Sequence, residues 1–315
     1  MTDTASLDNV DIRIIGDLLQ GTSSFGIPRG IRGSLKQISE KLGLDKDTVR
    51  KRIKKLQKAG VIQGWQIVCN PSLLGARTFM IHVEVDPDSS SKKEVMRKMN
   101  LIPGVIGVAD SLGRDLMVGI VCESEQSLKR HIDLISELAK VKISWHYEIH
   151  MPEVNSKFTL TDWKLMRALR KNPLVTYKEL GKAIGMSSRA AARRLNWLID
   201  GRAALMLPLI NFRAISGAIP IDLFVFYTSS LYKKEVDSKI ISRYKDSIIR
   251  AGFGGPERGH FTFIMPSLEA LQEMLDWIKD TKEVKETRIY FVLEQSFAFE
   301  PYDDLIEKKI IAANK

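Results

Sequence analysis

Cysteine is scarce in this chain of 315 residues, which contains only Cys69 and Cys122. Neither belongs to a Cys-x-x-Cys pair, and the two lie too far apart for a zinc or redox motif, so we expect both to be reduced structural residues. The five histidines show no His-Glu-x-x-His or other metal-ligand spacing. A phosphate-binding Gly-rich loop and a Gly-x-Ser-x-Gly nucleophile motif are also missing. We therefore expect no cofactor, no metal and no catalysis.

Long hydrophobic runs are missing as well. No apolar stretch approaches the roughly 18 residues that cross a bilayer. The first residues lack the basic start and apolar core of a secretory signal. Hydrophobic residues make up 44% and charged residues 27% of the chain, which are ordinary globular values. We expect a cytoplasmic protein with no membrane partner.

Acidic residues are fewer than basic ones. Lys and Arg number 48 against 38 Asp and Glu, and the formal net charge is +10. Such a balance favours an anionic partner. The length exceeds the roughly 100 to 200 residues of a usual domain, so several domains are expected.

The segment from Ser34 to Gly64 has the pattern of a helix-turn-helix. Ser34 is the expected cap of a short helix, whose buried face is formed by Leu35, Ile38 and Leu42. Gly43 supplies the tolerance of positive φ that a tight inter-helix turn requires, and Asp45 can cap the next helix. The buried face of that next helix comprises Val49, Ile53 and Leu56, opposite a cationic surface.

Two flanking segments complete a winged module. Upstream, Asp8 is the expected cap of a first helix, with Asp11 favourable near its positive end. Downstream, Gly60 ends the third helix, and the apolar residues around Gly64 predict the strands of a wing. A basic helix of this kind fits the major groove of double-stranded DNA.

The same pattern recurs in degenerate form over residues 176–207, where Thr176 and Ser187 are the expected caps and Gly185 the turn. Its buried stripe comprises Tyr177, Leu180, Ile184, Ala191, Leu195 and Leu198. Residues 201–207 are more apolar than a DNA-facing wing should be. The DNA role of this copy is therefore less strongly indicated than that of the first.

The two copies differ in length between their first two helices. Asp162 corresponds to Asp11 and Gly185 to Gly43, which leaves additional residues in the first copy. These form the run 21–33, rich in Gly, Ser and Arg, which is expected to be a flexible basic loop.

Several motifs together carry a family resemblance. They are Leu7-Asp8-x-x-Asp11, the helix pair, Gly60-Val61-Ile62-x-Gly64-Trp65 and Asn70-Pro71-x-x-Leu74-Gly75. The combination resembles the N-terminal half of the Lrp/AsnC (feast/famine) transcription regulators. The resemblance implies a sequence-specific, DNA-binding transcription regulator.

Each module is followed by a segment of the order β-α-β-β-α-β. The expected elements are strand 79–85, helix 92–98, strands 105–109 and 116–121, helix 126–139 and strand 141–149, and then strand 221–227, helix 234–244, strands 248–253 and 261–265, helix 268–279 and strand 284–293. This order predicts a ferredoxin-like sandwich with helices on one sheet face. It is similar to the ligand-sensing and dimerising domain of the same family.

The predicted fold class is α+β, with two winged helix-turn-helix domains alternating with two ferredoxin-like sandwiches. The expected domains are 1–70 and 157–212 for the winged modules, 76–152 and 217–300 for the sandwiches, and a tail at 301–315. The tail has Leu305, Ile306 and Ile310 at near-helical spacing and is expected to dock on a sandwich. The tandem chain either folds as an internal pseudo-dimer, with its sandwiches packed sheet to sheet, or pairs with a second chain as a homo-oligomer.

The candidate DNA-binding residues lie on the two third helices. Those expected to approach base edges are Asp47, Lys51, Lys54, Arg189, Arg193 and Asn196. Those expected to hold phosphates or helix ends are Arg50, Arg52, Lys55, Lys58 and Arg194, and Lys46 is also expected at the DNA. The alternative is that these cations form solvated helix faces.

The family resemblance also implies an effector site, because small effectors, often amino acids, bind in that family near a Gly-x-x-Asp-like turn between the second and third sandwich strands. Gly113, Arg114 and Asp115 match this turn with one residue fewer. The alternative is an ordinary hairpin whose Gly supplies positive φ and whose Asp caps backbone amides.

Two other functions are compatible with the pattern. An architectural DNA-binding protein would keep the basic helices and sense nothing. The siroheme decarboxylases have the same two-part architecture, so fold alone does not exclude catalysis. The cationic helices would have no explanation in such an enzyme, which favours the regulator.

Overall fold

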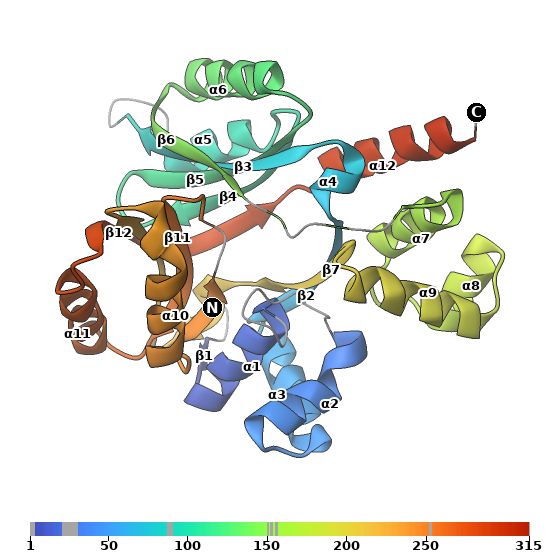
Figure 1. Ribbon diagram of the computed structural model, residues 1–315, viewed down its shortest axis with the longest axis horizontal. Coiled ribbons are helices and arrows are strands. Elements are labelled where there is room, and N and C mark those ends of the chain that lie inside the picture. Colours follow the sequence, from blue (N-terminus) through green and yellow to red (C-terminus); the bar gives the residue numbers. More distant parts are fainter. Residues whose placement is uncertain are drawn as a thin grey trace.

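The computed structural model describes residues 4–20, 31–86, 91–149, 151, 154, 157–251 and 254–314. Figure 1 shows two sandwiches on one side of the molecule and two helical modules on the other. The elements of the first half are β1 (Ala5–Ser6), α1 (Asn9–Gln20), α2 (Ile31–Leu42), α3 (Lys46–Lys58), β2 (Ile62–Cys69), α4 (Pro71–Leu74), β3 (Arg77–Val85), α5 (Lys92–Met99), β4 (Val105–Ser111), β5 (Asp115–Cys122), α6 (Glu125–Ala139) and β6 (Val141–Ile149).

The second half repeats this order with additions. Its elements are α7 (Leu160–Lys171), α8 (Tyr177–Ile184), α9 (Ser188–Asp200), β7 (Ala204–Ile210), the 3-10 helix η1 (Phe212–Ala214), β8 (Ile215–Ser216), β9 (Ile219–Tyr227), the 3-10 helix η2 (Ser230–Tyr232), α10 (Lys233–Arg243), β10 (Ile248–Ala251), β11 (Arg258–Met265), α11 (Leu268–Lys279), β12 (Val284–Phe297) and α12 (Glu300–Ala313). Among these elements no helix has both the length and the apolarity to cross a bilayer.

The caps and turns of the helical modules follow local sequence chemistry. Asp45 accepts a hydrogen bond from the Thr48 N–H at 2.8 Å and so caps α3. Gly185 (φ 73°) ends α8 in the left-handed region, where most side chains would be strained. One expected cap is wrong, because α2 begins at Ile31 and Ser34 lies inside it. Of the expected loop 21–33, residues 21–30 lie outside the described residues, and the last three belong to α2.

The predicted wing differs from the structure. Residues 62–69 form a single strand, β2, which pairs antiparallel with β7 of the other module, for example Gln66 with Leu207. This pairing explains why the residues after α9 are apolar, since β7 is largely buried. The two modules therefore complete each other through a shared two-stranded sheet.

The two sandwiches are joined into one eight-stranded sheet, in the order β10-β11-β9-β12-β4-β5-β3-β6. Each sandwich alone has the ferredoxin-like order expected from the sequence. The joint is β12, whose first part pairs with β9 and whose last residues pair with β4, as in Ser296 opposite Val108. Helices α5 and α6 cover one face of the first sheet, and α10 and α11 cover the matching face of the second.

The uncovered sheet faces pack against each other inside the same chain. Met117, Tyr147, Phe224 and Tyr290 form a buried cluster that draws on both sandwiches. Across this layer the Tyr147 hydroxyl lies 2.9 Å from Nδ1 of His260. Of the two arrangements left open by the sequence, the chain adopts the internal pseudo-dimer.

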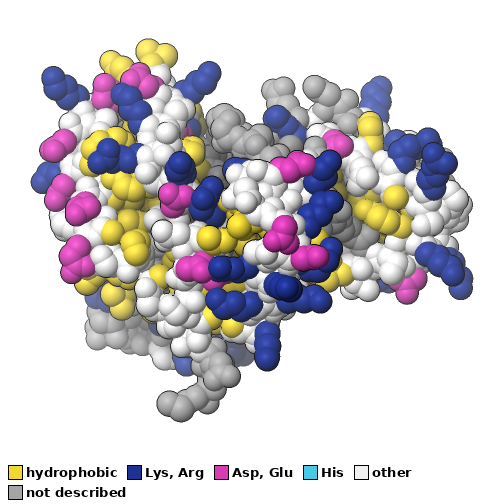
Figure 2. All heavy atoms as spheres, turned by 90° about the horizontal axis from the view of Figure 1, so that it is seen from below, with side chains coloured by type: hydrophobic (Ala, Val, Ile, Leu, Met, Phe, Trp, Pro, Cys, Tyr) yellow, Lys and Arg dark blue, Asp and Glu magenta, His cyan; other side chains and the backbone are white. Residues whose placement is uncertain are grey.

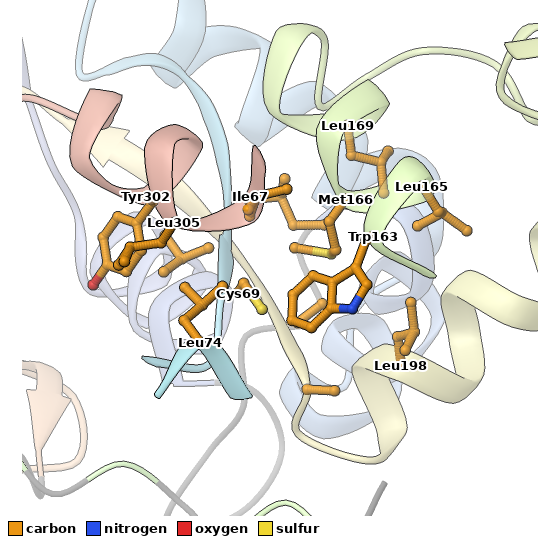
Figure 3. Close-up of a cluster of buried hydrophobic side chains, with 14 of the residues drawn as sticks. Ile67, Cys69, Leu74, Trp163, Leu165, Met166, Leu169, Leu198, Tyr302 and Leu305 are labelled. Carbon is orange, nitrogen blue, oxygen red and sulfur yellow. The ribbon is translucent and has the colours of Figure 1, made fainter. Parts of the chain in front are cut away.

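The C-terminal tail is helical, and it contacts the first sandwich as expected but packs mainly on the second helical module. Helix α12 packs against α7, α4 and β4, so the second helical module, rather than a sandwich alone, receives it. Tyr302, Leu305 and Ile306 enter the same buried cluster as Trp163 and Met166 of α7 (Figure 3). The module is fixed by this packing at one end and by the β2–β7 pair at the other.

Candidate nucleic-acid interface

Helix α3 separates its apolar and cationic residues as the sequence predicts. Val49, Ile53 and Leu56 are buried in the core of the first module. The exposed side chains of the helix are Lys46, Asp47, Arg50, Lys51, Lys54, Lys55 and Lys58. The helix therefore offers solvent a nearly continuous cationic face, interrupted by the Asp47–Arg50 ion pair.

Arg52 and Lys55 have partners within the module. The buried carboxylate of Asp11 accepts hydrogen bonds from Arg52 and Lys55, both at 3.1 Å. Arg52 also pairs with Asp8 at the start of α1. These contacts hold α3 against the positive end of α1, and a phosphate contact from either cation stays a prediction.

Helix α9 of the second module has the same division. Ala191, Leu195 and Leu198 are buried, whereas the side chains of Arg189, Arg193 and Asn196 are exposed. Arg194 points inward and binds the buried carboxylate of Asp162 on α7 with both ends of its guanidinium. It also lies 4.1 Å over the ring of Trp197.

Asp162 is held ionised by this arrangement. Burial raises the pKa of its carboxyl, but hydrogen bonds from Arg194 and Thr159 outweigh burial and leave the pKa below its ordinary value. An ionised Asp162 paired with Arg194 fixes the position of α9 relative to α7. The first module has the corresponding contact between Asp11 and Arg52.

The cationic faces of the two modules are turned outward on one side of the molecule. Figure 2, seen from below, shows dark blue Lys and Arg side chains gathered across the middle, over the first module, and again at the right-hand end, over the second. The sandwich helices α6 and α5 lie at the opposite side (Figure 1). Lys and Arg side chains of both modules are thus seen from this one side of the molecule.

Sequence reasoning missed Trp197. It lies beside Asn196 on α9, is 41% exposed, and borders a pocket of about 400 Å³ lined by Thr159, Thr161, Met186, Ala190, Arg193, Arg194 and Trp197. The available signal was its register, because an exposed tryptophan stands where the first module has Lys55.

The predicted effector turn is a tight hairpin between β4 and β5. Gly113 has φ 83°, as such a turn requires. Arg114 donates to the Val85 carbonyl at 3.0 Å, and Asp115 lies 2.9 Å from Nε2 of His82. Arg114 and Asp115 are thus joined to strand β3, and the Gly113 carbonyl accepts a hydrogen bond from Lys92 of α5.

Polar groups between the two sheets include two buried histidines. His82 stacks on Trp145 with ring centroids 5.1 Å apart. Nε2 of His260 lies 3.3 Å from Asp222. Burial lowers the pKa of both histidines, so the imidazoles are neutral at neutral pH. Within the described ranges no group of His, Cys, Asp and Glu has an arrangement that could hold a metal ion.

Comparisons with known proteins agree on the helical modules. The winged helix-turn-helix DNA-binding family matches residues 34–63 and 158–201. The HTH-type transcriptional regulator PH1916 of Pyrococcus horikoshii is 31% identical over 139 residues, which are 43% of this chain and 87% of that protein. The HTH-type transcriptional regulator FL11 of Pyrococcus furiosus is 28% identical over 137 residues, 43% of this chain and 84% of that protein.

Among solved structures, the siroheme decarboxylase NirDL is similar to nearly the whole chain. The match covers 96% of this chain and 99% of that one, with a TM-score of 0.54 and 16% sequence identity. At this identity the likeness concerns the arrangement of the elements and not the chemistry.

The relatives, the two matched modules and the motifs that flank them point to the same group of proteins. Each relative matches less than half of this chain, which is consistent with a chain built from two units. The chain belongs to the Lrp/AsnC family of HTH-type transcriptional regulators and carries the family's helix-turn-helix and sandwich unit twice.

Proposed function

We propose that this protein regulates transcription by binding double-stranded DNA in a sequence-dependent manner, with α3 and α9 each entering a major groove. The observation that carries the proposal is the shared geometry of the two helices. Each has a buried apolar stripe on one side and exposed groove-compatible side chains on the other. If these cations only kept a helix face solvated, they would not need to recur on the side opposite the core in both modules.

One chain supplies both recognition helices. The β2–β7 pairing connects the modules directly, so their separation does not depend on a second copy. Paired recognition helices of this type contact half-sites about 34 to 36 Å apart, one turn of DNA, or a multiple of it. The internal pseudo-dimer therefore takes the place of the dimer that a single-unit regulator would need.

Electrophoretic retardation of genomic fragments by the full chain tests this function. We expect retarded complexes at low ionic strength, and a subset of fragments that survives competition by excess nonspecific DNA. The logarithm of the binding constant should fall linearly with the logarithm of the salt concentration, because Lys and Arg release counterions from the phosphates when they bind. Equal competition by every fragment would favour an architectural protein without sequence preference.

An amino-acid effector is a separate part of the proposal, supported by the family resemblance of the turn at Gly113. Lys92 donates to the Gly113 carbonyl at 3.0 Å, and Asp115 is bonded to His82, so a ligand there would have to exchange these contacts. Calorimetric titration with single amino acids tests it. An amino acid that binds and changes the affinity for DNA supports a sensor. If no amino acid gives a heat of binding, the effector proposal is contradicted.

A further inference from the structure

We propose that this chain recognises an asymmetric operator, made of two unlike half-sites in a fixed order, and that its second half-site is read by Arg189, Arg193 and Asn196. This inference rests on the proposed function. A homodimer presents two identical helices related by a twofold axis, and its operator is correspondingly palindromic. A chain that carries both helices itself is free of that constraint.

The structure defines which residues of the two recognition helices are equivalent. Arg52 of α3 binds the buried Asp11 of α1, and Arg194 of α9 binds the buried Asp162 of α7. These two contacts fix the rotation of each third helix about its own axis relative to the first helix of its module. Positions counted from Arg52 and from Arg194 therefore face the same direction in the two modules.

The outward-facing residues at equivalent positions are different. The pairs, first module before second, are Asp47 and Arg189, Lys51 and Arg193, Lys54 and Asn196, Lys55 and Trp197, and Lys58 and Asp200. The α3 face is dominated by lysine, and the α9 face by arginine, an amide and an aromatic ring. The pairs Asp47/Arg189 and Lys54/Asn196 differ in hydrogen-bonding chemistry, so the two helices should prefer different bases at these positions.

The chemistry of α9 indicates its half-site. Arginine binds O6 and N7 of guanine with two hydrogen bonds, and asparagine binds N6 and N7 of adenine in the same way. The side chains of Arg193 and Asn196 are both exposed on α9. We expect guanine opposite the arginines and adenine opposite Asn196. Lysine is a point charge without this planar geometry, so the α3 half-site depends more on phosphate contacts.

Trp197 adds a further difference between the half-sites. Its counterpart Lys55 is drawn to Asp11, whereas the Trp197 ring is held by Arg194 and stays 41% exposed beside the pocket. An exposed apolar ring at the edge of a recognition helix suits the C5-methyl group of thymine.

The order of the half-sites is fixed because the modules are not free to exchange places. Strands β2 and β7 pair over their length, α1 packs on β10, and α12 fastens α7 through Arg170 and Asp303, which are 2.7 Å apart. One spacing and one orientation of the two half-sites should therefore be preferred.

Selection from a pool of random duplexes with the full chain tests the inference. We expect enriched sequences with two unlike halves in one order and at one spacing, bound about tenfold or more tightly than the same halves in inverted order. Enrichment of an inverted repeat, or of a single half-site, would overturn the inference while leaving DNA binding intact. Failure to enrich any duplex would overturn the proposed function, and this inference with it.

A variant sharpens the test. The changes Arg189→Asp, Arg193→Lys, Asn196→Lys, Trp197→Lys and Asp200→Lys give α9 the α3 residues at all five outward-facing positions without touching its buried stripe. We expect this variant to gain preference for an inverted repeat of the α3 half-site and to lose its preference for the α9 half-site. A matched pair of exposed cations on α6, changed by Lys129→Ala and Arg130→Ala, should leave the selected sequence unchanged. An unaltered preference in the α9 variant would overturn the assignment.

Discussion

Arg194 donates two hydrogen bonds from its guanidinium to the buried carboxylate of Asp162, and the distance from Nη2 of Arg194 to Oδ2 of Asp162 is 2.6 Å. The contact ties the recognition helix of the second module to its first helix. Asp11 and Arg52 make the equivalent contact in the first module. The pair is structural in both modules, and it orients the side chains around it toward solvent.

Removal of Arg194 should destabilise the fold. Arg194→Ala leaves the buried Asp162 carboxylate without its charged partner, at a cost of about 3 kcal/mol. The free energy of unfolding, measured by denaturant titration, checks this. The neighbouring Arg193→Ala is the control, because its exposed side chain should change stability by less than about 0.5 kcal/mol while weakening DNA binding. Equal stability of the two variants would contradict the structural role of Arg194.

Alanine at Lys51 or Lys54 should weaken specific DNA binding by about 1–3 kcal/mol each if these side chains contact base edges. Both are exposed on α3, so the unfolding transition should not move. Fluorescence anisotropy with specific and scrambled duplexes measures the effect. Unchanged affinity for the specific duplex would exclude both residues from the groove.

Alanine at Arg50 or Lys58 should act differently. If these cations bind phosphates, affinity should fall by a similar factor for every duplex, and the slope of log K against log salt should become shallower by about 0.9 for each phosphate that is no longer neutralised. A titration between low and moderate salt checks this. Weakening confined to one sequence would instead assign the residue to a base.

Ile306→Ala in α12 should cost about 2–5 kcal/mol, because Ile306 is 1% exposed in the cluster that α12 shares with α7. Ile311 is 59% exposed on the same helix, and Ile311→Ala should be nearly neutral. Chemical denaturation of the two variants gives the comparison. Similar midpoints would mean that the C-terminal helix does not support the second module.

The stability of the fold should depend on pH through His82. Burial lowers the pKa of His82, and Asp115 offsets this only in part. The unfolded chain then binds the proton more readily, so the free energy of unfolding is fully maintained above about pH 6.5 and decreases as the pH falls below it.

His82→Phe keeps the ring against Trp145 and removes the titrating group. The decrease in stability between about pH 7.5 and 5.5, on either side of the ordinary histidine pKa, should become smaller in this variant than in the unchanged protein. A pH dependence that is the same in the variant and the unchanged protein would contradict the role of His82.

The sequence predicts the elements of both sandwiches well, because strand alternation and helix periodicity are local properties. The expected strand 284–293 is shorter than β12, which continues to Phe297. That extension contains all but one of the β12 residues that pair with β4, the exception being Val292. Glu294 and Gln295 interrupt the alternation of apolar and polar residues that predicts a strand. Their pairing with β4 joins segments far apart in the sequence, so a local pattern cannot predict it.

The site was predictable in part for the same reason. The exposed face of α3 follows from the spacing of Val49, Ile53 and Leu56. The ion pair between Arg52 and Asp11 could not be predicted from that spacing, because the two residues lie far apart in the sequence and meet only when α1 packs on α3. The prediction of a wing within the first module was wrong for a similar reason, because the partner strand of β2 is β7 of the other module.

Hydroxyl-radical footprinting of a selected duplex with the full chain tests the central claim most directly. Binding by both modules of a single chain predicts two protected segments about one helical turn apart, or a multiple of it, at one chain per duplex. A single protected segment would contradict the role of α9. An absence of protection at low ionic strength would contradict the account as a whole.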